Sequence, residues 1–171
     1  MDPFSVSTVI SAPREEIFDY LQDISNHPEF TDHYLVDWHL TRIDPVGVGA
    51  GARFRVKAPL NRYSWADVTL AEVDRPYRIV EHGRTGKGNR IRTLGVYELD
   101  PVAGEATKVT FTLQTAPATF ADRLMESFGA RAWTRRKTRK ALQRLRAIME
   151  GGAGVSARAA RRGPRVTVAG G

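Results

Sequence analysis

Apolar and polar residues alternate along most of the first 115 positions, at the period of half-buried β-strands. In the first such segment, residues 4–10, the side chains of Phe4, Val6 and Ile10 fall on one face. The same period returns in segments separated by turn residues: 36–40, 52–56, 63–73, 77–82, 91–99 and 108–114. Strands joined by such short turns pair antiparallel. The pattern therefore predicts an antiparallel β-sheet of about seven strands.

Two short helices are predicted between the first strand and the remaining strands. Residues 14–22 follow Pro13 and carry acidic residues in the first turn, which favours a helix start. Their apolar positions share one side. A second short helix is expected near residue 26, because Ser25 or Asn26 can cap it and Pro28 suits its first turn.

Residues 117–150 are predicted to form one long amphipathic helix that begins near Pro117 and ends at Gly151–Gly152. The opposite face is basic. Around residues 129–132 the apolar stripe thins to small side chains, which predicts either a kink or empty space beneath the helix. The apolar stripe consists of residues three or four positions apart, or multiples of these: Phe120, Leu124, Phe128, Ala132, Leu142, Leu145 and Met149.

An antiparallel sheet needs one face covered, and the long helix is the one predicted element able to cover it. Five segments, together with Pro28, also resemble the START-like superfamily, called SRPBCC, Bet v 1-like or the polyketide cyclase/dehydrase and lipid-transport group. The resemblance implies an α+β helix-grip fold, in which the sheet wraps around the long C-terminal helix and two short helices follow the first strand. The segments are ISAPREEIFDYLQD (10–23), GVG (47–49), EVDRPYRIV (72–80), TKVT (107–110) and LQRLRAIME (142–150).

Length and charge divide the chain of 171 residues into two parts. We expect one domain over residues 1–151 and a mobile tail, rich in Gly, Ala and Arg, over residues 152–171. Residues 1–130 hold 14 basic and 18 acidic residues, whereas residues 131–171 hold 12 basic and 1 acidic. The basic end indicates weak, non-specific contact with polyanions such as nucleic acid or anionic membranes.

Several classes of chemistry lack support in the sequence. The chain has no cysteine, which excludes disulfides and zinc-thiolate sites, and no Gly-x-Ser-x-Gly motif of hydrolases. It has neither a signal peptide nor an apolar run of about 20 residues, so we expect a cytoplasmic protein without a transmembrane segment. Glycines at 47–51 and 83–88 suit turns better than phosphate loops. We interpret His27, Asp32, His33, Asp37 and His39 as surface or loop residues and expect no metal and no cofactor.

A ligand cavity between the sheet and the long helix is the site that the resemblance implies. The primary hypothesis is binding or carriage of a hydrophobic small molecule, such as a lipid or an aromatic, polyketide-like compound. The alternatives are a polyketide cyclase/dehydrase-type enzyme and an interaction module that uses residues 131–171. Polar anchors are sought among Tyr63, Glu81, His82 and Arg92, although alternation does not fix which of them face inward. Candidate lining residues are Trp38, Phe54, Trp65, Tyr97, Phe111, Phe120, Leu124, Phe128 and Ala132.

Overall fold

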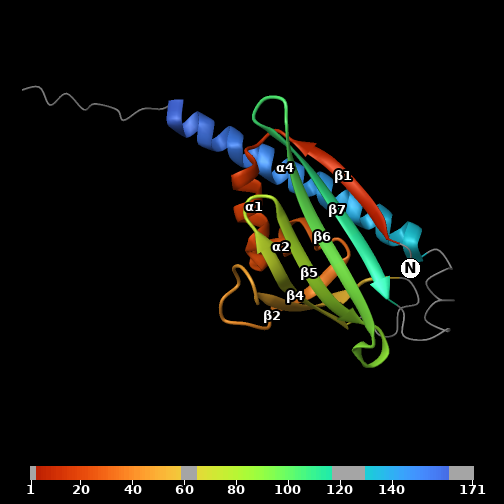
Figure 1. Cartoon of the computed structure of the whole chain (residues 1–171). Helices are drawn as coiled ribbons and strands as arrows, with labels where there is room; N and C mark the ends of the chain where they lie inside the picture. Colours follow the sequence, from red (N-terminus) through yellow and green to blue (C-terminus); the bar gives the residue numbers. More distant parts are fainter. Residues whose placement is uncertain (1–2, 59–64, 117–129, 162–171) are drawn as a thin grey trace, which may run out of the picture.

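The computed structural model describes residues 3–58, 65–116 and 130–161, with side chains described as far as residue 151. Its centre is one seven-stranded antiparallel sheet, as the alternation predicts (Figure 1). The strand order is β1-β7-β6-β5-β4-β3-β2, so six strands form a meander and β1 joins it beside the last strand. The strands are β1 Phe4–Ile10, β2 Leu35–Leu40, β3 Gly51–Val56, β4 Trp65–Asp74, β5 Arg78–Thr85, β6 Ile91–Val102 and β7 Ala106–Ala116.

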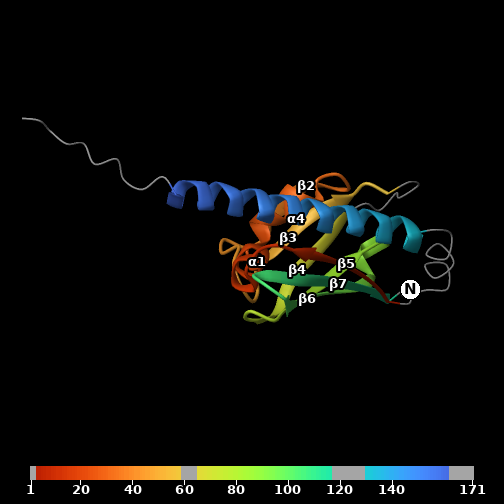
Figure 2. The same cartoon turned by 90° about the horizontal axis from the view of Figure 1, so that it is seen from above.

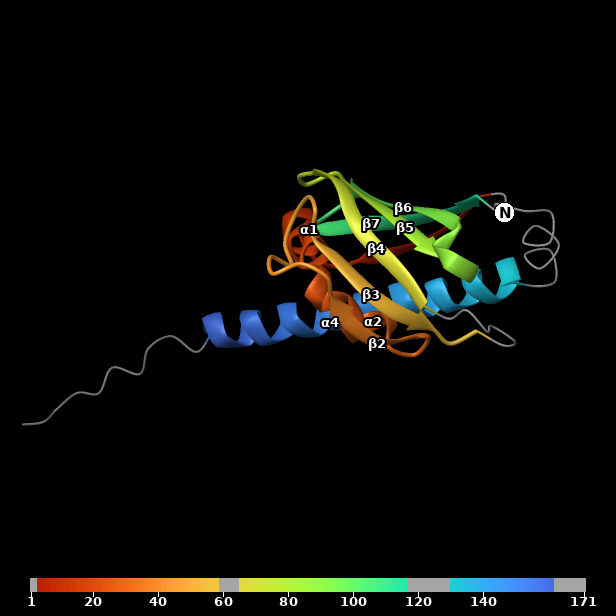
Figure 3. The same cartoon turned by 90° about the horizontal axis from the view of Figure 1, so that it is seen from below.

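The two predicted short helices are confirmed after β1. Helix α1 spans Arg14–Gln22, and α2 spans His27–Thr31 after a single 3₁₀ turn, η1, at Ile24–Asn26. Asp23 caps this turn, since its side chain accepts a hydrogen bond from the backbone N–H of Ser25. The view from below shows that α2 lies next to both α4 and β2 (Figure 3). The short helices thus close one end of the space beside the sheet.

The long helix α4 spans Arg131–Arg161 and lies across one face of the sheet, where it packs against β1 and α2 (Figure 2). The predicted end at Gly151–Gly152 is wrong, because the helix continues for about two and a half more turns. Glycine costs a helix only about 1 kcal/mol relative to alanine, and the next proline, Pro164, comes after the end of α4 at Arg161. The predicted start at Pro117 lies outside the described residues.

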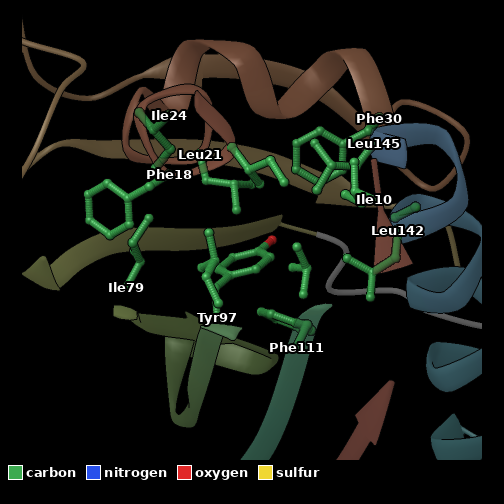
Figure 4. Close-up of a cluster of buried hydrophobic side chains, with 14 of the residues drawn as sticks. Ile10, Phe18, Leu21, Ile24, Phe30, Ile79, Tyr97, Phe111, Leu142 and Leu145 are labelled. Atoms are coloured by element: carbon green, nitrogen blue, oxygen red, sulfur yellow. The ribbon is translucent and has the colours of Figure 1, made fainter. Parts of the chain in front are cut away.

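The core lies between the sheet, the short helices and α4. Figure 4 shows side chains from these three groups pointing toward one another, including Phe18 and Leu21 from α1 and Leu142 and Leu145 from α4. Polar contacts also hold α4 in place. Arg144 donates to the side chain of Asp32 and to the backbone carbonyl of Glu29, and Glu150 accepts from the backbone N–H of Ser11.

Candidate ligand-binding cavity

A cavity of about 670 Å³ lies between the sheet and α4. Strands β2 to β7 supply one wall, and α2 and α4 supply the other. Four predicted lining residues, Trp38, Phe54, Tyr97 and Phe111, do line it. The rings of Trp38 and Phe54 stack with centroids 4.7 Å apart, and those of Tyr97 and Phe111 are 4.5 Å apart. These pairs present broad apolar faces to the cavity, as small-molecule sites commonly do.

Other predicted residues lie elsewhere. Trp65 is 45% exposed and lies near His39 and Arg55, because its neighbour Ala66 takes the inward position on β4. His82 and Arg92 line a separate polar hollow of about 760 Å³ on the opposite face of the sheet. Their side chains therefore cannot anchor a ligand in the cavity. Four predicted residues lie outside the described ranges: Tyr63, Phe120, Leu124 and Phe128.

Ala132 is exposed and does not line the cavity, so its predicted position is wrong. The apolar stripe places it on the inward face by its four-residue spacing from Phe128 and by steps of three or four residues from Leu142, which is ten residues away. At 3.6 residues per turn, ten residues leave Ala132 about 80° off the line of Leu142. The predicted space beneath this part of the helix is real, but Trp133, Thr138 and Ala141 face it instead.

A polar corner interrupts the apolar lining. Among the described residues, Glu81 on β5 is the one predicted polar anchor that faces inward, and its Oε1 atom is 3.7 Å from His27 Nδ1 on α2. His27 is buried, and its Nε2 atom is 2.8 Å from the backbone carbonyl oxygen of Leu21. A carbonyl oxygen only accepts, so Nε2 carries the ring proton and Nδ1 presents a lone pair. Two acceptors thus face each other unless the carboxyl of Glu81 is protonated.

Burial sets the ionisation of this corner. It raises the pKa of Glu81 to about 7 and lowers the pKa of His27 to about 4, because each charged form loses water. Burial also raises the pKa values of Tyr34 and Tyr97, and the nearby Glu81 adds to both shifts. At neutral pH the corner therefore holds a neutral imidazole, two neutral phenols and a carboxyl near its titration midpoint.

His27 is a site residue that the sequence analysis missed, since it was interpreted as a surface or loop residue. Its position three residues after Ile24 and three before Phe30 would have placed it on their buried face. Tyr34, Trp133 and Thr138 were missed as well. Their signal is weak, because the sequence spacing alone does not show whether these residues face a cavity or water.

Comparison with known proteins extends this description. Residues 1–150 match the model of the family described as "Polyketide cyclase / dehydrase and lipid transport". The chain belongs to this family. The resemblance to the START-like superfamily and the helix-grip fold are thereby confirmed, and the family supports a ligand-binding fold. No curated protein matches the chain in sequence.

Solved structures share the fold at low sequence identity. TTHA0849 from Thermus thermophilus has a TM-score of 0.66 and 13% identity over 88% of this chain and 98% of its own. The jhp0584 protein of Helicobacter pylori has a TM-score of 0.67 and 10% identity over 86% and 88%. Truncated norcoclaurine synthase from Thalictrum flavum has a TM-score of 0.63 and 8% identity over 86% and 92%. At these identities the likeness shows the fold alone.

None of the described helices is long and apolar enough to span a membrane. Within the same part of the chain, no three His, Asp or Glu side chains come together as a group that could hold a metal ion.

Proposed function

We propose that this protein binds or carries a hydrophobic small molecule in the cavity beneath α4. The observation that carries the proposal is the cavity itself: about 670 Å³, within the range of known ligand sites, and lined mainly by aromatic and aliphatic side chains. A few polar groups gathered in one corner complete the pattern of a ligand pocket. The family supports a binding fold without naming the ligand.

The test compares two substitutions of the same kind on one helix. Ala141 is buried and lines the cavity, whereas Ala132 is exposed. We expect Ala141→Phe to weaken binding of an apolar fluorescent probe at least tenfold, because the ring fills the cavity, at a cost of about 1–3 kcal/mol in stability. Ala132→Phe should leave binding unchanged. Equal binding by the two folded variants would contradict the proposal, and Ala66→Phe on β4 offers a second block if Ala141→Phe does not fold.

The second candidate is a cyclase/dehydrase-type enzyme. It is favoured by Glu81, whose pKa of about 7 lets it exchange a proton near neutrality, together with the nearby His27 and Tyr97. Native mass spectrometry of freshly purified protein distinguishes the two. A carrier returns its co-purified compound unchanged on incubation, whereas an enzyme converts its substrate and releases a product of different mass or retention.

A further inference from the structure

Two buried polar atoms on residues that line this cavity have no hydrogen-bond partner among the described residues: Glu81 Oε1 and Trp38 Nε1. Buried polar groups in native proteins are nearly always satisfied, so such a pair calls for an explanation. Both residues lie beside His27, since the ring centroids of Trp38 and His27 are 6.0 Å apart. One of the two atoms accepts and the other donates.

The second oxygen of Glu81 is turned toward Gly95, which also lines the cavity. A Cβ at Gly95 would lie 3.0 Å from Glu81 Oε2, and the glycine therefore leaves this oxygen uncovered. His27 lies beside the other oxygen, with Nδ1 3.7 Å from Glu81 Oε1. Whether the carboxyl is ionised or protonated on the side of His27, Oε2 remains an acceptor.

The functional group that matches this corner is one that both donates and accepts. A hydroxyl group can donate to Glu81 and accept from the indole N–H of Trp38. An ammonium group would leave the indole unpaired, and a ketone would leave the carboxylate unpaired. Because most of the remaining lining is aromatic or aliphatic, with Asp67 and several threonines as further polar residues, the hydroxyl must sit on a largely apolar body.

This inference rests on the proposed function. We propose that Glu81 is the specificity-determining residue of the cavity and accepts a hydrogen bond from the hydroxyl of an apolar alcohol or phenol.

The experiment compares 2-naphthol with 2-methoxynaphthalene, which keeps the rings but cannot donate. Titrations at pH 8 should show roughly tenfold tighter binding of 2-naphthol, as expected for a hydrogen bond to a charged group. Glu81→Met should abolish this preference while still binding 2-methoxynaphthalene. Glu98→Met is the matched control, because Glu98 lies exposed on the outer face of β6, and it should keep the preference.

The pH dependence of 2-naphthol binding distinguishes a direct role of Glu81 in binding from a purely structural role. Between pH 6 and 8 the affinity for 2-naphthol should rise severalfold, because the ionised carboxylate is the stronger acceptor. The other titratable groups lining the cavity stay in one state there: the pKa of Asp67 is lowered by its bond to Arg53, that of His27 is lowered, and those of Tyr34 and Tyr97 are raised. Outside the cavity, Asp23 acts on His27 through its charge. Glu81→Gln, which conserves shape, should flatten the profile.

The outcomes separate the two proposals. Equal binding of both compounds to the unmodified protein would overturn the role of Glu81 and leave the cavity proposal standing. A preference that survives in Glu81→Met would also overturn it. Failure of the unmodified protein to bind either compound, together with failure to bind the apolar fluorescent probe, would overturn the proposed function itself.

Discussion

Burial moves the pKa values of Glu81 and His27 in opposite directions, and the two shifts act oppositely on stability. The folded state keeps the proton of Glu81 up to a pH of about 7, whereas the unfolded chain loses it near 4.5, so the free energy of unfolding falls as pH rises through this window. Folded His27 stays neutral down to about pH 4, whereas the unfolded chain takes up a proton below 6.5. The contribution of His27 to the free energy of unfolding therefore falls as pH falls. Between pH 4.5 and 6.5 the two contributions offset each other.

Glu81→Gln should therefore expose the contribution of His27. From pH 4.5 to 6.5 we expect the free energy of unfolding of the variant to rise by about 2–3 kcal/mol more than that of the unmodified protein. Urea denaturation at three pH values in this window measures it, with Glu98→Gln as an exposed control. Parallel pH profiles of Glu81→Gln and the unmodified protein would show that the carboxyl is not buried in solution.

The sequence predicts the positions of the strands more fully than it predicts which face of the sheet each residue occupies. Alternation placed Val36, Trp38 and Leu40 on one face of a strand. In the structure the strand has a bulge between Val36 and His39, where Asp37 has a φ of 54°. The bulge changes which face the following residues occupy, so Trp38 lines the cavity while Leu40 is 43% exposed. Alternation shows no sign of a bulge, because the extra residue changes the face without changing the composition.

At the scale of elements, α4 is the second wall of the cavity, and residues 142–145 near the middle of the helix hold it on the core. Leu142 and Leu145 are buried against the core, and Arg144 binds α2 through Asp32 and the carbonyl of Glu29. The spacing of these leucines predicted a helix and its buried side. The spacing could not predict which side of α4 faces the cavity about three turns earlier, near Ala132, or that the helix continues beyond Gly152. The small and polar residues in these two stretches are compatible with more than one orientation and end point.

Leu145→Ala should destabilise the protein by about 2–5 kcal/mol, because it removes a fully buried side chain and leaves a space beneath α4. Leu40→Ala, the same change at a position that is 43% exposed, should cost less than about 1 kcal/mol. Thermal and urea unfolding of both variants measure the difference. Similar losses in the two variants would mean that α4 does not dock on the core as described.

At the scale of the whole molecule, positive charge is concentrated at one end. Residues 131–171 carry about +11, whereas residues 1–130 carry about −4. Arg135, Arg136, Arg139 and Lys140 are exposed on α4 and form no ion pairs within the described part of the chain. Since the opposite face of α4 is committed to the core, we propose that this surface holds polyanions by charge alone.

Binding to duplex DNA should therefore be weak and steeply salt-dependent. For about four neutralised phosphates, affinity should fall roughly a hundredfold between 50 and 200 mM salt.

The double substitution of Arg135→Glu with Arg139→Glu should weaken DNA binding further, whereas Lys108→Glu on the exposed face of β7 should not. Residues 152–171 begin with the last ten residues of α4, and we propose that they lie outside the folded domain. Deleting them removes four arginines and should reduce the salt dependence without lowering the melting temperature. Fluorescence anisotropy at several salt concentrations measures this, and tight, sequence-selective binding at physiological salt would contradict it.

The pairing of β1 with β7 has a consequence for how the protein is made. Ser5 bonds Thr112 across 107 residues of chain, and the backbone of Ser11 bonds Glu150 across 139. At translation rates of about 5–20 residues per second, the first strand leaves the ribosome on the order of ten seconds before its partners exist. Throughout that interval Phe4, Val6 and Ile10 belong to an apolar, unpaired strand, the kind of segment that chaperones shield. Nascent chains stalled before α4 should therefore be the species most prone to aggregation.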